Sequence, residues 1–428
     1  MHNFDINIEN LSKVEGHANL DVRVRNGEVQ NVKLQIIENQ RFFEQAARGQ
    51  PIRTLPQLMS RICGTCSIAH LTCCIEAIEK GLEIEPTEQA LLMKKLSMYG
   101  LMIRDHALHL YFFSLPDLIG KDSILDFSDS GNESKLLHDS FDVKRAGNIL
   151  STIVAGKAVH APYPTVGGFL RVPNETDIMK TVIELKRIRP LVLDIIDLFY
   201  RWNENFERDT SFVALTTTDF SFIEGEINSS KGICVREKDY LEHLINIVIP
   251  YSQATGFEFE GEEFMVGALS RMNLNKCSLH SDTKKDAAEY LKIFPSTNIF
   301  YNNLAQGIEI LHSIDHSIEL LENTKFKKEE LQRPIIKEEK TGVGVIEAPR
   351  GTLYYKLTIG KSGNVKKANV IVPTAQNQIN IEKDIAKLVQ DNLEKMTKEK
   401  IEYAIEKLLR AYDPCMSCAT HFLKVRWV

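Results

Sequence analysis

Residues 61–70 read RICGTCSIAH, and residues 413–421 read DPCMSCATH. Each stretch contains a Cys-x-x-Cys pair, and this spacing lets both thiolates reach one metal ion. The four residues are Cys63, Cys66, Cys415 and Cys418. Because the pairs lie near opposite ends of a 428-residue chain, only a fold that brings both ends together can form a four-sulfur site.

The composition excludes several classes of protein. Eight cysteines are too few for a disulfide framework, and MHNFDINIEN at the start lacks the basic and apolar segments of a signal peptide. The apolar stretches are too short for a membrane span. The 52 basic and 58 acidic residues form no block of like charge, so we expect no nucleic-acid partner. These features predict a cytoplasmic protein with reduced thiols.

Cys-x-x-Cys pairs also occur in structural zinc sites and in thioredoxin-like redox proteins. A structural zinc site would use four thiolates, although zinc ribbons commonly close loops of about 15–20 residues. A thioredoxin-like redox pair would lie in a βαβ unit, which the sequence does not predict. The remaining cysteines are expected to be small buried hydrophobic residues: Cys73, Cys74, Cys234 and Cys277.

Hydrophobic periodicity predicts an α+β fold with a central bundle of long helices and peripheral antiparallel β-hairpins. Alternating apolar residues in the first forty positions, with Asn26-Gly27 between two runs, indicate a β-hairpin. Asn174 is the expected N-cap of one helix. The long helices are expected at 87–111, 136–160, 175–207 and 298–321.

The rest of the chain mixes strands and helices. Short strands are expected within 212–264, a hairpin within 343–372, and one charged helix over 381–412. No glycine-rich nucleotide-binding loop occurs in the sequence. We divide the chain into an N-terminal β segment (1–48), a helical core (49–211), a peripheral segment (212–280), a C-terminal helical and hairpin part (281–421) and a tail (422–428).

The two cysteine stretches resemble the Arg-x-Cys-Gly-x-Cys-x-x-x-His and Asp-Pro-Cys-x-x-Cys-x-x-His signatures of the large subunit of nickel-iron hydrogenases. The resemblance extends over essentially the whole chain and looks most like the cytosolic, bidirectional NAD(P)-linked and sulfhydrogenase-type members. Further matching stretches are KVEGH (13–17), RFFE (41–44), HALH (106–109), GKAVHAPYPTVGGF (156–169), EAPRG (347–351) and VPTAQN (372–377).

The resemblance implies the hydrogenase large-subunit fold and reversible, heterolytic splitting of H2. It makes Cys63 and Cys415 terminal ligands of nickel. Cys66 and Cys418 would bridge nickel to an iron that carries carbon monoxide and cyanide. Thiolates suit this role because they favour soft, redox-active metals.

The resemblance also implies residues around the metals. Glu15 matches a carboxylate that passes protons and would lie beside Cys415. Arg350 matches a guanidinium over the open coordination position, with Asp117 and Asp413 as the acidic residues that orient it. The cyanide pocket would be lined by Pro349 and Thr374.

A second metal site is implied near the C-terminus. Glu44, the backbone carbonyl of Gln378 and His421 match the ligands of a magnesium or iron ion. His70 matches a residue close to the cysteine cluster, and His160 a packing or hydrogen-bonding residue.

The resemblance further implies partners. Residues 422–428, FLKVRWV, match a tail that a maturation endopeptidase removes. No further cysteine set has the spacing of an iron-sulfur cluster, so electrons would leave through an iron-sulfur small subunit and further electron-transfer subunits. The acceptor would be NAD(P), a deazaflavin, polysulfide or a heterodisulfide reductase partner. A metal-free electron-transfer scaffold of the respiratory complex I type is the alternative, and the four cysteines argue against it.

Overall fold

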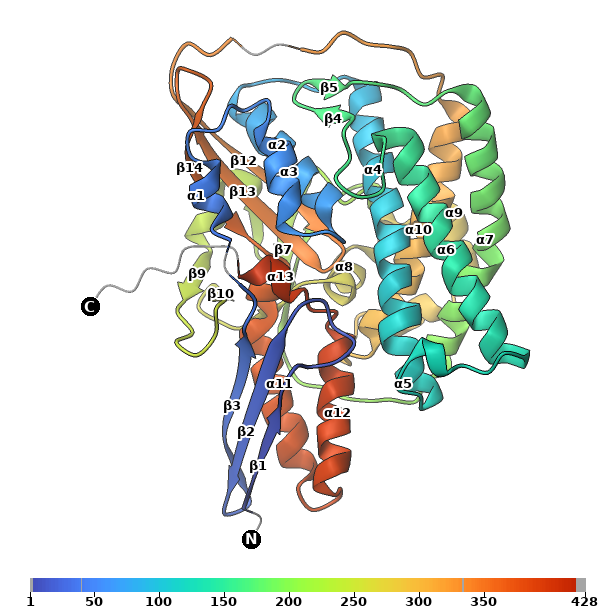
Figure 1. Ribbon diagram of the computed structural model, residues 1–428, viewed down its shortest axis with the longest axis vertical. Coiled ribbons are helices and arrows are strands. Elements are labelled where there is room, and N and C mark those ends of the chain that lie inside the picture. The colour runs from blue at the N-terminus through green and yellow to red at the C-terminus, as the bar shows by residue number, and fades with distance from the viewer. Residues whose placement is uncertain (1–2, 40, 333–334, 421–428) are drawn as a thin grey trace.

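The computed structural model describes residues 3–39, 41–332 and 335–420, and a bundle of long helices forms one side of the molecule (Figure 1). These helices pack pairwise and confirm the predicted bundle. Asn174 is the N-cap of one of them, since its side chain accepts a hydrogen bond from Asp177 N at 2.9 Å. The bundle consists of α4 (Glu88–Ala107), α6 (Gly131–Ala155), α7 (Glu175–Arg201) and α10 (Tyr301–Asn323).

Helices α4 and α6 cross at a very short distance. A Cβ atom at Gly147 of α6 would lie 2.7 Å from the backbone nitrogen of Arg104 on α4, so a larger residue cannot fit there. Beyond α4 the chain continues as a π-helical turn, Leu108–Ser114, into α5 (Leu115–Ile119). Helix α6 ends at Gly156, whose φ of 90° is favourable only for glycine.

The N-terminal strands form an antiparallel sheet that projects from the body of the molecule (Figure 1). The expected turn is present, because Asn26 and Gly27 both have positive φ and Arg25 pairs with Glu28. The strands are β1 (Phe4–Ile8), β2 (Ala18–Arg25) and β3 (Glu28–Ile36).

The predicted hairpin near 343–372 belongs to a three-stranded antiparallel sheet. Its strands are β12 (Lys340–Ala348), β13 (Gly351–Ile359) and β14 (Val365–Ile371). Helix α3 (Ser67–Gly81) packs directly on β12 and β13. The loop that carries the first cysteine pair therefore begins a helix whose position the sheet fixes.

The expectation of a single helix over 381–412 is wrong. The segment forms two helices, α11 (Pro373–Asn392) and α12 (Lys398–Ala411), which pack against each other. The chain reverses between them, and this reversal buries an apolar face of each helix. Periodicity within each helix does not reveal such a reversal, because it depends on tertiary packing.

The remaining elements surround this frame. The region 212–264 contains the expected short strands, in a four-stranded sheet of order β11-β6-β7-β8 and a separate β9-β10 pair. These strands are β6 (Ser211–Thr216), β7 (Glu226–Ser229), β8 (Cys234–Arg236), β9 (Leu244–Ile247), β10 (Gly256–Phe259) and β11 (Phe264–Met265). Shorter elements are α1 (Phe43–Ala47), α2 (Leu55–Met59), β4 (Pro164–Thr165), β5 (Gly168–Phe169), α8 (Ala268–Asn275), α9 (Ser281–Asp286) and α13 (Met416–Ala419).

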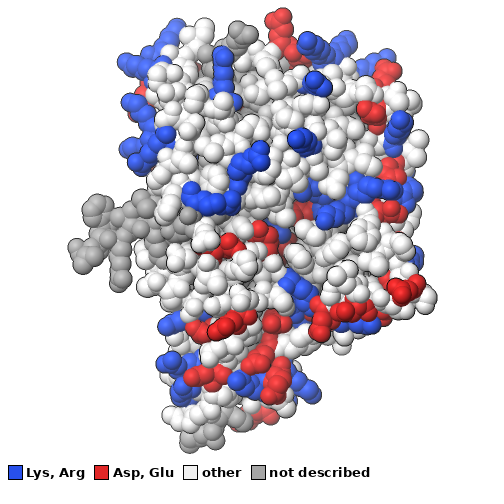
Figure 2. All heavy atoms as spheres, viewed as in Figure 1, with Lys and Arg blue, Asp and Glu red and all other residues white. Residues whose placement is uncertain are grey.

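Charged side chains of both signs lie on the surface of the molecule. On the face drawn in Figure 2, acidic side chains interrupt the basic ones, and this face shows no continuous basic groove. Within the described part of the chain, no helix is both long and apolar enough to cross a membrane. The predicted boundaries at 48, 211 and 280 stay predictions.

Candidate metal centre

Four cysteine sulfurs from the two ends of the chain meet in one buried cluster. The sulfur of Cys63 lies 3.6 Å from that of Cys415, and the sulfurs of Cys66 and Cys418 lie 3.3 Å apart. All four ligand atoms lie within 4.8 Å of one another, so one metal centre can contact them all. Among the residues that the structure describes, no other group of three or more His, Cys, Asp or Glu side chains is so arranged.

Local structure explains how each pair is presented. Cys63 is extended after a short 3-10 turn, and Cys66 is the N-cap residue of α3. Cys415 is likewise extended at the start of α13, and Cys418 lies on that helix. Both pairs therefore lie at the point where a loop enters a helix.

The four thiols differ in acidity in the metal-free chain. Hydrogen bonds from neighbouring thiols, first that of Cys415, hold the pKa of Cys63 well below its ordinary value. Burial raises the pKa of Cys415 well above its ordinary value. Burial thus favours the protonated thiol at Cys415, and a bound metal would displace this proton.

Glu15 lies beside the cluster, as the sequence predicted. Its Oε2 accepts hydrogen bonds from Cys415 Sγ at 2.9 Å and from Ser417 N at 3.2 Å, and its Oε1 accepts one from Ser417 Oγ at 2.6 Å. Burial, together with the charge of Cys63, raises the pKa of Glu15. Its protonated form is therefore favoured relative to an exposed glutamate, and the carboxylate lies where it can exchange a proton with the adjacent sulfur.

The backbone fixes this contact as well. Met416 N donates a hydrogen bond to Glu15 O at 2.8 Å. At Gly16 φ is 83°, and a Cβ atom there would lie 2.9 Å from Met416 Cβ. Glycine is required at this position because the two chain segments approach so closely.

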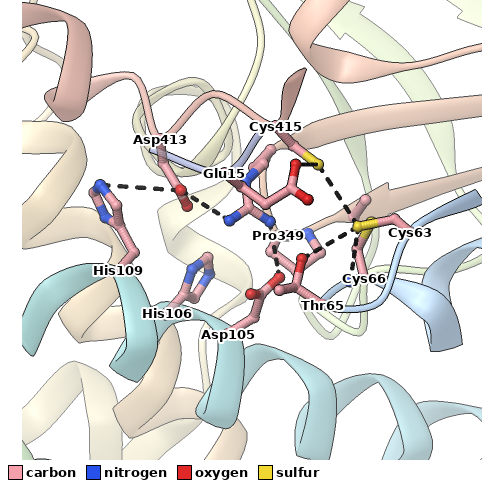
Figure 3. Close-up of polar contacts among 12 residues, drawn as sticks. Glu15, Cys63, Thr65, Cys66, Asp105, His106, His109, Pro349, Asp413 and Cys415 are labelled. Carbon is pink, nitrogen blue, oxygen red and sulfur yellow. Dashed lines mark hydrogen bonds and ion pairs between the residues drawn. The ribbon is translucent and has the colours of Figure 1, made fainter. Parts of the chain in front are cut away.

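Arg350 lies between the carboxylates of Asp105 and Asp413, and Figure 3 shows these two aspartates near the cysteine cluster. Arg350 Nη1 donates to Asp105 Oδ2 at 2.9 Å, and its Nη2 lies 3.0 Å from Asp413 Oδ1. All three side chains are buried. The guanidinium is thus held in one orientation close to the cysteine cluster.

The expectation that Asp117 orients Arg350 is wrong. Asp117 accepts hydrogen bonds from Arg410 and Lys13 instead, and Asp105 is the second carboxylate at Arg350. Both aspartates belong to one helical stretch, but they lie about 18 Å apart along its axis, so they cannot contact the same guanidinium.

Three further predicted residues lie close to the cluster or to the segments that carry it. His70 Nε2 lies 3.6 Å from Cys418 Sγ, and its Nδ1 contacts the Tyr355 hydroxyl at 2.8 Å. Thr374 Oγ1 accepts a hydrogen bond from Cys415 N at 2.8 Å. Pro349, the neighbour of Arg350, accepts a hydrogen bond from Arg271 through its carbonyl oxygen.

His160 has a structural environment. Its backbone nitrogen donates to Ser67 Oγ at 3.1 Å, and its Nδ1 lies 3.4 Å from Ser60 Oγ. These contacts connect its loop to the start of α3. They agree with the packing and hydrogen-bonding role expected for this residue.

The predicted second metal site is described only in part, because His421 lies outside the described residues. Glu44 accepts a hydrogen bond from Val370 N at 2.7 Å, and burial raises its pKa to about 7. The side chain of Gln378 donates to Leu34 O at 3.0 Å, so it contributes to the packing of α11 against β3.

Sequence reasoning missed several residues of the site. Asp105 is one, and it directly precedes the HALH stretch that the resemblance had marked. His109 is another: its Nε2 lies 4.0 Å from Asp413 Oδ1, and its ring nitrogens contact Gln306 Oε1 at 2.6 Å and Arg410 O at 2.8 Å. Arg104 donates to Thr65 O at 2.6 Å, within the loop between the first two cysteines.

The donor set fits a redox metal centre. Four sulfurs favour soft transition metals. The buried Nε atoms of Arg104 and Arg350 have no hydrogen-bond partner among the described residues, which suits a bound group with acceptor atoms. A buried sulfur cluster with an adjacent carboxylate and guanidinium defines a metal-dependent redox enzyme.

Comparisons with known proteins identify the family. A family model described as nickel-dependent hydrogenase matches residues 41–145 and 242–421. Sulfhydrogenase 1 subunit alpha of Pyrococcus furiosus is 31% identical, with 98% of each chain covered. The beta subunit of an NAD-reducing hydrogenase of Cupriavidus necator is 28% identical, covering 97% of this chain and 94% of its own.

Solved structures agree. An NAD+-reducing NiFe hydrogenase in the H2-reduced state superposes with a TM-score of 0.87 at 25% identity, covering 98% of this chain and 99% of the other. The chain belongs to the nickel-dependent hydrogenase family. It is a large, catalytic subunit and an oxidoreductase that acts on hydrogen, and the predicted family, fold class and enzyme class are confirmed.

Proposed function

We propose that Cys63, Cys66, Cys415 and Cys418 hold a nickel-iron centre whose iron carries carbon monoxide and cyanide. The observation that carries this proposal is the four-sulfur cluster, with Glu15 in contact with one of its sulfurs. The sulfurs of Cys415 and Cys418 lie 3.0 Å apart, and each also contacts a sulfur of the first pair, so one centre can bind all four. When bound, such a centre would supply heterolytic cleavage of H2 and accept its electrons.

Glu15 moves protons between the cluster and the rest of the protein. It accepts a proton from the Cys415 sulfur, since its Oε2 already lies within hydrogen-bond distance. Burial and the charge of Cys63 raise its pKa, which favours uptake of this proton. Ser417 holds both carboxylate oxygens in place during this transfer.

Arg350 supplies a fixed positive charge close to the sulfurs. Asp105 and Asp413 orient its guanidinium, and the buried environment strengthens its electrostatic effect. Pro349 and Thr374 line the pocket for the cyanide ligands, and His70 supports the Cys418 sulfur. Glu44, the Gln378 carbonyl and His421 hold a magnesium or iron ion.

Electrons leave through a partner chain. Of the cysteines outside the cluster, Cys73 and Cys74 are buried as expected, whereas the expectation of burial is wrong for Cys234 and Cys277, which are exposed. We therefore assign electron transfer to an iron-sulfur small subunit and further subunits. The relatives named sulfhydrogenase and NAD-reducing hydrogenase support a cytoplasmic enzyme with a polysulfide or NAD(P) acceptor. A maturation endopeptidase would remove residues 422–428.

Elemental analysis and infrared spectroscopy of the purified protein test the proposal. One nickel per chain and at least one iron, with bands of carbon monoxide and cyanide, are expected. Cys415→Ser should lose nickel and hydrogen oxidation, whereas Cys73→Ser, which changes a buried cysteine outside the cluster, should retain both. Zinc as the sole metal would contradict the assignment.

A further inference from the structure

Asp117 joins the two ends of the chain at a point away from the metal cluster. Its Oδ1 accepts hydrogen bonds from Lys13 Nζ at 2.6 Å and from Arg410 Nη2 at 3.0 Å. Its Oδ2 accepts a hydrogen bond from Arg410 Nε at 2.5 Å. The side chains of Asp117 and Arg410 are 1% and 2% exposed, so this bidentate pair is fully desolvated.

Both cations precede residues of the active site. Lys13 lies two positions before Glu15, and Arg410 lies five positions before Cys415. Arg410 Nη1 also contacts the carbonyl oxygen of Ser12 at 3.4 Å. Asp117, on α5, is therefore the common acceptor for one segment that carries the proton-accepting carboxylate and another that carries a metal-binding thiol.

The backbone of the first segment requires such support. Lys13 has a φ of 55°, in the left-handed region that is unfavourable for residues other than glycine. Such conformations persist when surrounding contacts hold them. The contact with Asp117 fixes one side of Glu15, and the hydrogen bond from Met416 N to Glu15 O fixes the other.

We propose that Asp117 is a positioning residue: it holds Lys13 and Arg410 together and thereby sets the position of Glu15 relative to Cys415. This inference rests on the proton-transfer role proposed for Glu15. Without the Asp117 carboxylate, Lys13 and Arg410 would face each other, and Arg410 would keep only Glu406 as a carboxylate partner. Arg410 is buried and cannot reach water, so the less buried Lys13, which is 14% exposed, would move out and release the segment before Glu15.

The chain contains a matched control. Asp315 forms a bidentate pair with Arg189 at 2.6 and 3.0 Å, and its side chain is 3% exposed. This pair joins α10 to α7 in the helix bundle. Asp315→Asn thus removes a buried carboxylate from a similar arginine pair that touches neither cysteine segment.

Amide hydrogen exchange of the full-length chain tests the positioning without relying on metal. In Asp117→Asn we expect exchange at Met416 and Ser417 to become at least tenfold faster, because both amides donate to Glu15. Asp315→Asn should leave these two amides unchanged. Equal protection in Asp117→Asn and the parent, or equal loosening in both variants, would overturn the proposal.

A milder pair of variants covers the case in which Asp117→Asn does not fold. Lys13→Met should speed amide exchange at the same two residues. Lys13→Arg should leave their exchange rates as in the parent chain, because it keeps a positive charge at Asp117. If Lys13→Met exchanges like the parent chain, Asp117 does not act through this segment.

In the metal-loaded enzyme, deuterium exchange between D2 and water gives a separate readout. Asp117→Asn should slow it, and the double variant with Glu15→Gln should be no slower than Glu15→Gln alone, since both changes affect one step. If the double variant is slower than Glu15→Gln by the full factor that Asp117→Asn causes alone, the positioning role is contradicted. A parent chain without nickel would refute the proposed function, and the amide-exchange result would still decide the role of Asp117.

Discussion

The carboxylate of Glu15 lies 2.9 Å from the sulfur of Cys415, although 400 positions separate the two residues in the sequence. The contact is supported by backbone pairing between the same two residues and by a glycine that permits the close approach. A proton leaving the cysteine cluster therefore has an acceptor within one hydrogen bond.

Replacement of this acceptor should separate proton transfer from hydrogen cleavage. Glu15→Gln keeps the size and the hydrogen bond to Ser417 but cannot take up a proton. We expect D2–water isotope exchange to slow by roughly 10²–10⁴-fold. Conversion of para- to ortho-hydrogen and the nickel content should be retained. The control, Glu382→Gln, changes a carboxylate that accepts from Leu34 N. Normal exchange in Glu15→Gln would assign the relay to another group.

The orientation of Arg350 should matter as much as its charge. Arg350→Lys keeps a cation but cannot contact Asp105 and Asp413 with two fixed nitrogen atoms. Hydrogen oxidation should fall by roughly 10²–10³-fold at unchanged nickel content. Arg189→Lys alters an arginine that pairs with Asp286 and Asp315 and should retain full activity. Equal rates in both variants would show that charge alone suffices.

The close crossing of α4 and α6 should connect stability to metal binding. Gly147→Ala would place a Cβ atom 2.7 Å from Arg104 N, and overpacking of this kind costs about 1–3 kcal/mol. Because Arg104 holds the carbonyl of Thr65 between Cys63 and Cys66, nickel content should fall as well. Urea unfolding and metal analysis measure both effects. A destabilised variant with full nickel content would show that the two are independent.

Glu237 should make stability depend on pH. Burial, together with nearby Glu76, raises its pKa to about 8 from an ordinary value of 4.5, while Lys80 opposes this shift. Between these values the folded chain keeps a proton that the unfolded chain releases, so the free energy of unfolding falls as pH rises. Glu237→Gln removes this dependence, and Lys80 keeps its contact with Glu76.

The expected gain relative to the parent chain is on the order of 5 kcal/mol above pH 8, since the pKa rises from 4.5 to about 8 and one pKa unit corresponds to about 1.4 kcal/mol. It should disappear below about pH 5, under the same relation between protonation and stability. Urea unfolding at a series of pH values measures it, with the exposed Glu226→Gln as control. Parallel curves for Glu237→Gln and the parent would contradict the raised pKa.

Features set by local chemistry were predictable from the sequence. The turn at Asn26 and Gly27 and the N-cap at Asn174 depend on neighbouring residues only. The cluster of four cysteines was predictable because the resemblance linked two motifs that spacing alone could not join. The helix reversal between α11 and α12 was missed because it depends on tertiary packing.

The choice between Asp105 and Asp117 shows the same limit inside the site. Both residues are acidic and lie near the HALH stretch, so residue type does not distinguish them. They lie about 18 Å apart along one helical stretch, so they cannot contact the same guanidinium. Only the folded chain shows that Asp105 contacts Arg350 and that Asp117 contacts Lys13 and Arg410.

The placement of the fourth sulfur at residue 418 has a consequence for biosynthesis. At about 5–20 residues per second, a ribosome needs roughly 20 to 80 s to add the residues between Cys66 and Cys418. During that time Glu15, Cys63 and Cys66 exist without their partners. A chain truncated before residue 415 lacks half of the sulfur ligands. The complete metal centre can therefore form only after translation has passed the second cysteine pair.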